Sequence, residues 1–166
     1  MYKRQKSGLY LAEVSSDEEL KEICNIFVTR ANVGMLPYSI PKGLIEFRIG
    51  IAKGNYVRAI YLDNTLVGFI AACINTPYFC PEKVLQQVYY ICDLDGMQGM
   101  RAVVMAHEAL INYAEGQKIP YILATCSPLD TDNKLALILE KRGWRRFGYA
   151  VVWNCSTSDV PSGLKP

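Results

Sequence analysis

The sequence predicts an α/β (α+β) protein in which a mixed β-sheet carries helices on both faces. The chain has 166 residues, of which 51% are apolar and 20% are charged, so it can bury one substantial core. Runs rich in strand-forming residues alternate with segments of helical periodicity. Three strands follow one another in the middle of the chain. That run excludes the strict βαβ alternation of a doubly wound sheet and implies a mixed sheet.

The first half of the chain is expected to fold as strand, helix, helix, strand, strand. Ser15 or Ser16 can accept a hydrogen bond from the first amides of a helix, and the acidic residues that follow suit its positive end. Asp63-Asn64 is a turn that joins two strands into a hairpin. The elements are expected at residues 9–14 (strand), from 15–19 to 32–34 (helix), 43–53 (helix), 57–62 (strand) and 65–74 (strand).

The second half is expected to alternate strands with helices. The centre of its first strand, residues 88–92, is rich in strand-forming side chains. Gly143 should end the last helix in a left-handed conformation. The elements are expected at residues 84–94 (strand), 100–115 (helix), 121–126 (strand), 133–142 (helix) and 147–154 (strand). We expect one domain over residues 9–155, between flexible ends at 1–8 and 156–166.

Composition narrows the possible classes of function. The formal net charge is only +2, which is too small for a dedicated nucleic-acid binder. His107 is the single histidine, so zinc sites that need two or three histidines are excluded. The six cysteines have no CxxC spacing, and we interpret them as reduced core residues. No apolar stretch reaches the ~20 residues of a membrane span. We therefore expect a cytoplasmic protein with no metal, nucleic-acid or membrane partner.

One segment carries chemistry: the strand that ends near Leu94, the loop Gly96-Met97-Gln98-Gly99 and the helix behind it. Glycines let backbone amides approach an anion closely, and a helix start adds free N–H groups and a positive dipole end. This combination binds a pyrophosphate group, and Arg101 can add a charge-assisted contact. The alternative interpretation is an ordinary glycine turn with a solvated Arg101.

The order of elements over residues 9–154 resembles the GNAT superfamily of acyl-CoA-dependent N-acyltransferases. Residues 89–102 are similar to the fourth strand of that family and its R/Q-x-x-G-x-G/A pyrophosphate loop, with Gly99 as the central glycine. Residues 133–144 are similar to its late helix. Three positions depart from the family pattern: Gly96 replaces Arg or Gln, Arg101 replaces Gly or Ala, and Leu139 stands where a tyrosine acid is common.

The resemblance implies a mostly antiparallel sheet of six to seven strands and acetyl-CoA as co-substrate. An amine attacks the thioester directly, and a backbone amide near Ile91 or Cys92 polarises the carbonyl. The candidate base is Asp93, with Glu82 as an alternative, and the candidate acids are Tyr90 and Tyr149. The expected cofactor-binding residues are Ile91, Cys92, Asp93, Gly96, Met97, Gln98, Gly99, Met100, Arg101 and Asn133.

The resemblance implies that the acceptor side is formed by two loops, which are apolar in this chain. These loops contain no acidic cluster, which argues against a polycationic acceptor and favours a small-molecule or protein amine with less charge. The same side chains can instead simply cover the core. The expected acceptor-binding residues are Met35, Leu36, Tyr38, Tyr78 and Phe79. The sequence allows a monomer or a homodimer.

The sequence also allows two other functions. Leu139 and Arg101 allow a GNAT-like protein that has lost catalysis and acts as a binding or assembly module. Cys126 and His107 allow a small thiol hydrolase, although nothing near Cys126 in the sequence favours a lowered thiol pKa.

Overall fold

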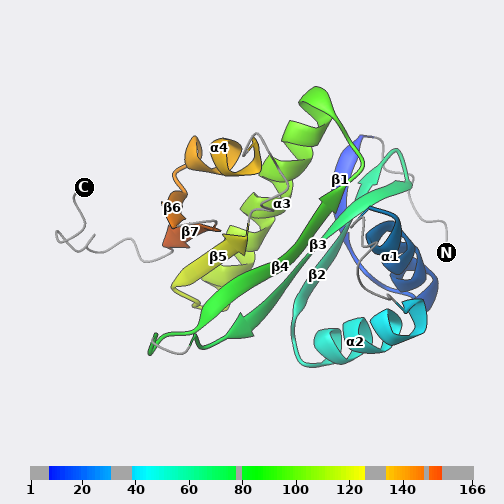
Figure 1. Ribbon diagram of the computed structural model, residues 1–166, viewed down its shortest axis with the longest axis horizontal. Coiled ribbons are helices and arrows are strands. Elements are labelled where there is room, and N and C mark those ends of the chain that lie inside the picture. Colours follow the sequence, from blue (N-terminus) through cyan, green and yellow to red (C-terminus); the bar gives the residue numbers. More distant parts are fainter. Residues whose placement is uncertain (1–7, 31–38, 78–79, 126–133, 148–149, 155–166) are drawn as a thin grey trace.

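The computed structural model describes residues 8–30, 39–77, 80–125, 134–147 and 150–154. These residues form a seven-stranded sheet with the order β1-β2-β3-β4-β5-β7-β6 (Figure 1). Only the pair β4–β5 is parallel. The strands are β1 (Leu9–Glu13), β2 (Tyr56–Leu62), β3 (Thr65–Asn75), β4 (Val84–Cys92), β5 (Tyr121–Thr125), β6 (Arg145–Phe147) and β7 (Ala150–Asn154). The helices are α1 (Asp17–Arg30), α2 (Ile40–Ala52), α3 (Gly96–Gly116) and α4 (Lys134–Glu140).

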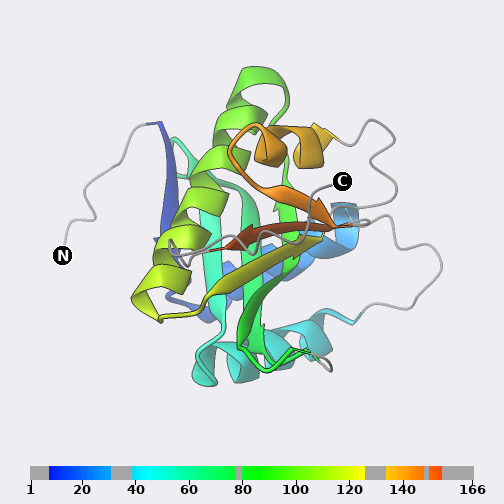
Figure 2. The same ribbon diagram turned by 90° about the vertical axis from the view of Figure 1, so that its left-hand side faces the viewer.

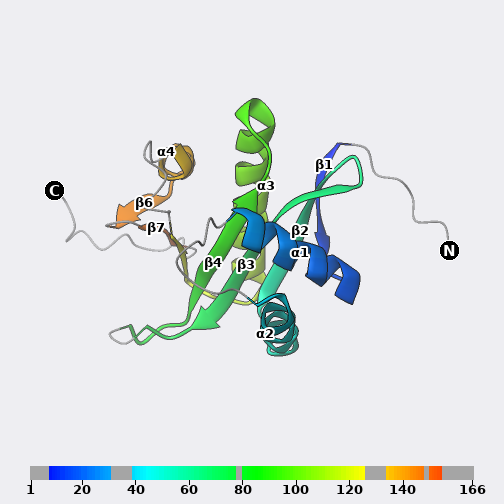
Figure 3. The ribbon, with the colours of Figure 1, turned by 45° about the vertical axis from the view of Figure 1, so that its right-hand side comes forward.

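Helices cover both faces of the sheet, as expected from the order of elements. Figure 3 shows α1 and α2 on one face of β2, β3 and β4, and Figure 2 views the molecule from the side of α3 and α4. Alternate strand residues serve the two faces. Val57 and Phe69 pack with Ile23 of α1, whereas Ile70 and Leu85 belong to the larger core under α3 and α4. The predicted mixed, mostly antiparallel α/β architecture is therefore confirmed.

Local signals in the sequence explain several element ends. Ser16 and Glu19 form a reciprocal cap on α1: the Glu19 amide donates to Ser16 Oγ at 3.2 Å, and the Ser16 amide donates to Glu19 Oε2 at 3.2 Å. Asp63 and Asn64 both have positive φ, which is typical of a tight hairpin turn. Gly143 has φ 93°, so the predicted left-handed end of the last helix is confirmed.

Two predicted boundaries are wrong. The helix expected over 100–115 begins at Gly96, so the expected glycine loop is the first turn of α3. Gly96 has φ 58°, and this left-handed conformation lets the chain turn into the helix directly after the strand. The strand expected over 147–154 is two strands, because Arg145–Phe147 forms β6, which pairs antiparallel with β7.

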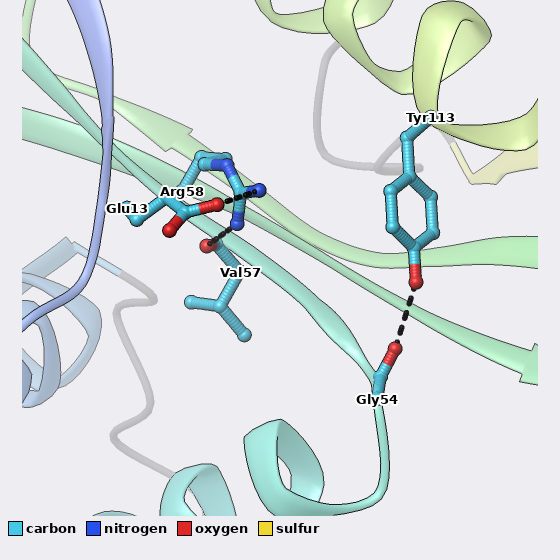
Figure 4. A network of polar contacts seen from close by, with 5 residues as sticks. All are labelled: Glu13, Gly54, Val57, Arg58 and Tyr113. Carbon is cyan, nitrogen blue, oxygen red and sulfur yellow. Dashed lines mark hydrogen bonds and ion pairs between the residues drawn. The ribbon is translucent and has the colours of Figure 1, made fainter. Parts of the chain in front are cut away.

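Polar contacts fix one edge of the sheet and the link after α2 (Figure 4). Arg58 Nη2 of β2 pairs with Glu13 Oε1 of β1 at 2.7 Å, and Arg58 Nη1 donates to the Val57 carbonyl at 2.9 Å. The Tyr113 hydroxyl of α3 donates to the carbonyl of Gly54 at 2.8 Å. The chain that leaves α2 is therefore held to a helix on the opposite face of the sheet.

Candidate active site

The strand pair β4–β5 opens near the middle of β4. Val84–Gln87 pairs with Tyr121–Ala124 of β5, while β4 continues to pair with β3 as far as Cys92. Within the described part of the chain, residues 89–92 of β4 therefore have a ladder partner on the β3 side only. One edge of this strand segment is left open, beside the start of α3.

A β-bulge lies at the point where the two strands part. Ala71 of β3 lies opposite Tyr89, and Ala72 lies opposite Gln87, which leaves Val88 as the extra residue. The bulge changes which side chains face each side of the sheet. Before it, Leu85 and Gln87 face α3; after it, Tyr90 and Cys92 do so. The side chains of Tyr89 and Ile91 then face α1.

The hydrogen-bond ladder turns two β4 amides toward the open edge. The Asp93 amide donates to the Val67 carbonyl of β3 at 2.7 Å. Because donors alternate along an antiparallel ladder, the N–H groups of Tyr90 and Cys92 point away from β3. Gly68 lies opposite Cys92, and a Cβ there would overlap the Ile91 carbonyl and approach Cys92 Cα to 2.8 Å. Only glycine therefore allows this close approach of the two strands.

The start of α3 offers backbone donors next to this edge. Its first hydrogen bond runs from the Gly99 amide to the Asp95 carbonyl at 3.1 Å. The amides of Gly96, Met97 and Gln98 precede that bond and have no partner within the helix. Asp95 occupies the N-cap position, but its side chain makes no capping hydrogen bond. These three amides and the helix dipole form an electropositive cradle suited to an anion.

Gly99 has a different role from the one expected. Its amide is already bonded to Asp95, so it does not contribute to the cradle. A Cβ at Gly99 would overlap the Leu94 carbonyl oxygen and lie 3.0 Å from the Leu94 carbonyl carbon. The glycine thus allows the first turn of α3 to pack directly against the end of β4, which places the cradle beside the open edge.

The other residues of α3 that the sequence predicts to bind the cofactor lie on its outer surface. Met97 and Met100 are 70% and 54% exposed, and the side chain of Arg101 is also exposed. Together with Glu108 they line a shallow cavity of about 350 Å³. Across this cavity, Arg142 pairs with Glu108 at 3.2 Å. Asn133 lies outside the described residues.

Asp93, the predicted base, is bound to a cation. Its Oδ1 lies 2.6 Å from Nε of Arg30, the last residue of α1. This ion pair joins the end of α1 to the end of β4. Glu82 precedes β4 at the opposite end of the strand from Asp93, where β4 is still paired with β5, so it does not reach the open edge.

Tyr90 brings a buried hydroxyl to the open segment of β4. Among the described residues this hydroxyl has no hydrogen-bond partner. The thiol of Cys92 is the side chain that, after burial, affects the pKa of Tyr90. Burial is the main reason why the pKa of Tyr90 is raised well above its usual range. Burial also raises the pKa of the Cys92 thiol. The phenol therefore stays protonated at neutral pH.

His107 is not available for catalysis. It is 1% exposed, with Nδ1 2.8 Å from the Val103 carbonyl and Nε2 2.7 Å from the side-chain amide of Gln87. Burial lowers the pKa of His107 to about 4, so the ring is neutral at pH 7. A buried neutral imidazole has a single N–H, and here the ring is held between the Val103 carbonyl and the Gln87 side chain, so His107 is a structural group. The thiol hydrolase alternative loses its base, and Cys126 lies outside the described residues.

The buried His107 predicts a pH dependence of stability. The unfolded chain takes up a proton near pH 6.5 and the folded protein only near pH 4, so the free energy of unfolding falls as pH drops through this window. The expected loss is about 3 kcal/mol by pH 4. Urea unfolding at several pH values measures it. A His107→Gln variant, which cannot titrate, should lose this part of the slope, and an unchanged slope would contradict the assignment.

Comparison with known proteins adds information about the fold. Sequence comparison finds no matching family model and no matching curated protein. Three similar solved structures are an N-acetyltransferase from Staphylococcus aureus Mu50, a Salmonella typhimurium protein described as an acetyltransferase and solved with acetyl-CoA, and a GNAT-family acetyltransferase from Streptococcus pneumoniae. Their TM-scores are 0.69, 0.69 and 0.64, at 11%, 9% and 10% identity. The alignments cover 90%, 95% and 88% of this chain and 100%, 100% and 98% of theirs.

The chain has the GNAT fold. The predicted GNAT-like architecture is thereby confirmed. At 9% to 11% identity, the solved structures establish the fold alone. The open edge of β4, the bulge at Val88 and the amides at the start of α3 are observed directly in this chain.

The structure shows where two residues considered for the acid role lie. Leu139 of α4, at the position where the family often has a tyrosine, is 1% exposed and belongs to the main core. Tyr90 lies on the open segment of β4, and its buried hydroxyl belongs to the side of the sheet that α3 covers. Several predicted residues lie outside the described ranges, and their placement stays a prediction: Tyr149 as acid, and Met35, Leu36, Tyr38, Tyr78 and Phe79 as acceptor-binding residues.

A cavity that the sequence did not reveal lies on the α1 and α2 side of the GNAT sheet. Its volume is about 620 Å³, and it reaches β4 at Val88 and Tyr89. The small residues Gly43 and Gly50 of α2 line it. Their spacing of seven residues on a helix is a signal that could have indicated close packing, but it does not indicate a cavity.

The described residues were also compared with the requirements of a metal site and of a membrane-spanning helix. Across those ranges, no three His, Cys, Asp or Glu side chains gather closely enough to hold a metal ion. Among the same residues, no helix has the length and apolar character needed to cross a bilayer.

Proposed function

We propose that this protein is an N-acetyltransferase that moves the acetyl group of acetyl-CoA to a primary amine. The observation that carries the proposal is the juxtaposition of two donor groups. The amides of Tyr90 and Cys92 face the open edge of β4, and the free amides of residues 96–98 lie at the start of the next helix. The first pair suits a thioester carbonyl, and the second set suits a pyrophosphate.

In this proposal, acetyl-CoA binds across these two sites. The pyrophosphate of acetyl-CoA binds the amides of Gly96, Met97 and Gln98 at the positive end of α3. The pantetheine arm lies along residues 88–92, where β4 has no partner on the β5 side among the residues that the structure describes. The thioester oxygen accepts a hydrogen bond from the Cys92 amide. Arg101 lies one turn further along α3 and adds positive charge on the same side.

The chemistry uses a neutral amine and a proton donor. The amine nitrogen attacks the thioester carbon, the C–S bond breaks, and the departing sulfur takes a proton. We assign this proton to the Tyr90 hydroxyl, whose burial keeps it protonated and which has no protein partner among the described residues. The proton that the amine loses passes to solvent at the open edge.

Asp93 is assigned a positioning role in this proposal. Its carboxylate is paired with Arg30 at 2.6 Å, so it holds the end of α1 against the end of β4. That contact fixes the strand end that precedes the cradle. The four described cysteines, Cys24, Cys73, Cys80 and Cys92, are free thiols, which supports the proposal of a reducing, cytoplasmic location.

A second candidate function is a binding module that has lost catalysis. The observation that favours it is Leu139, a core aliphatic residue at the position where the family often has its acid. This alternative keeps the donor site and predicts acetyl-CoA binding without transfer. Acetyl transfer to an amine therefore distinguishes the acetyltransferase from the binding module, because both functions include acetyl-CoA binding.

Thermal stabilisation by acetyl-CoA tests the donor site. A ligand at ~100 times its Kd should add about 2.7 kcal/mol to the free energy of unfolding. We expect acetyl-CoA and CoA to raise Tm, with ATP as the control that shares the adenine and phosphates but lacks the pantetheine arm. Equal shifts with all three compounds, or no shift with any, would contradict the donor site.

A further inference from the structure

The 620 Å³ cavity beside β4 has walls that define a class of acceptor. It lies between α1, α2 and the strands β2, β3 and β4. Phe27 and Val28 of α1, Phe47 of α2 and Val57 of β2 contribute apolar side chains to its lining. Tyr89 closes the β4 side and packs edge-on against Phe27 with ring centroids 4.9 Å apart. A cavity with such walls takes an apolar, aromatic-sized group.

The helix that forms the outer wall is fixed at several points. A Cβ on Gly43 would lie 3.2 Å from Cys24 Sγ, and a Cβ on Gly50 would lie 2.9 Å from Asn55 Nδ2. Between these close approaches, Phe47 packs edge-on against Phe69 with ring centroids 5.9 Å apart. The Tyr113–Gly54 hydrogen bond holds the chain just beyond α2. These contacts fix the position of α2, so the shape of the cavity is set by packed secondary-structure elements.

The charges on the lining are few and balanced. Among the described lining residues, Lys42 and Glu46 are the charged ones, and both are exposed on α2. One positive and one negative group at the rim do not select a polycation, which would need several carboxylates. The apolar interior therefore decides which acceptors fit.

The cavity also meets the proposed reaction centre. Val88 and Tyr89 line it, and Val88 is the bulge residue at which β4 parts from β5. The amides assigned to the thioester belong to the next residues of the strand. A molecule with its body in the cavity can therefore present a nitrogen at the open edge.

We propose that the acceptor is a small primary amine attached to an apolar, aromatic-sized body, an arylalkylamine in chemical terms. This inference rests on the proposed acetyl transfer and names its substrate class. The body of the acceptor occupies the cavity, and its amine reaches the thioester past Tyr89. The amine loses a proton to solvent, and its nitrogen gains the acetyl group as the C–S bond of acetyl-CoA breaks.

The test measures acetylation of two different amines by the unaltered protein and by a variant whose cavity is filled. The probes are 2-phenylethylamine and spermidine with acetyl-CoA as donor. The blocking variant is Cys73→Trp: Cys73 lies on β3, lines the cavity and is partly exposed. The matched control is Ile74→Trp, since the next strand residue points to the other face and does not line the cavity. Calorimetry of acetyl-CoA binding checks that each variant is folded.

We expect kcat/KM for 2-phenylethylamine to exceed that for spermidine by ~10-fold or more. Cys73→Trp should lower kcat/KM for 2-phenylethylamine by ~10-fold or more and leave the Kd of acetyl-CoA within about 2-fold, whereas Ile74→Trp should leave both values unchanged. A preference of the unaltered protein for spermidine, or full activity of a folded Cys73→Trp variant, would overturn this inference alone. Failure of the unaltered protein to bind acetyl-CoA would overturn the proposed function as well.

Discussion

Replacing Gly99 with glutamate should abolish measurable CoA binding, with a loss of affinity of ~100-fold or more. Two effects combine. A Cβ at this position overlaps the Leu94 carbonyl, so the first turn of α3 must move away from the end of β4. The new carboxylate also places a negative charge in the turn whose amides are assigned to the pyrophosphate, and like charges repel.

Two variants separate these effects from a general loss of structure. Gly99→Ala adds the Cβ without the charge and should give an intermediate affinity. Gly116→Glu makes the same charge change at the other end of α3, where a Cβ meets nothing within 4 Å, and should leave CoA affinity unchanged. Isothermal calorimetry measures all three affinities, and circular dichroism checks the fold. Unchanged affinity in a folded Gly99→Glu protein would remove the pyrophosphate site from the start of α3.

Replacing Tyr90 with phenylalanine should lower kcat by ~100-fold or more while leaving the Kd of acetyl-CoA unchanged. The substitution keeps the ring that packs 5.3 Å from His107 and removes only the hydroxyl. That hydroxyl is buried and has no hydrogen-bond partner among the described residues. Removing an unpaired buried polar group does not destabilise a protein. The variant should therefore unfold at the same temperature as the unaltered protein, or a higher one.

This combination of effects distinguishes a proton donor from a structural tyrosine. Tyr10→Phe is the matched control, because its hydroxyl donates to Asn64 Oδ1 at 3.1 Å on the opposite edge of the sheet. That variant should keep full kcat. Steady-state kinetics with saturating acetyl-CoA and thermal unfolding provide the two readouts. Full kcat in Tyr90→Phe would assign protonation of the thiolate to another group.

Much of the fold was predictable because its signals are local. The apolar periodicity, the cap at Ser16 and the turn at Asp63-Asn64 each involve neighbouring residues, and the structure confirms them. The start of α3 was misplaced because the sequence does not show that Gly96 adopts a left-handed conformation within the helix's first turn. The segment that carries the cradle was nevertheless identified, since a glycine-rich strand-to-helix link is typical of anion sites.

The parts of the candidate site that the sequence did not reveal depend on contacts between distant segments. The ion pair of Asp93 with Arg30 links β4 to α1, and no local pattern indicates it. The faces on which Tyr90 and Tyr89 lie depend on the bulge at Val88, which is a property of the pairing between β3 and β4. The cavity depends on the close packing of α2 at Gly43 and Gly50.

Quantifying both products of the reaction is the direct test of acetyl transfer by this protein. The purified, reduced protein is incubated with acetyl-CoA and a panel of primary amines that includes an arylalkylamine, an amino sugar and a polyamine. Free CoA thiol and N-acetylated amine are quantified in the same samples. We expect free CoA thiol and N-acetylated amine to appear in equal amounts, and we expect the Tyr90→Phe variant to form less of both. Binding of acetyl-CoA without acetylation of any amine, or release of thiol without N-acetyl product, would contradict it.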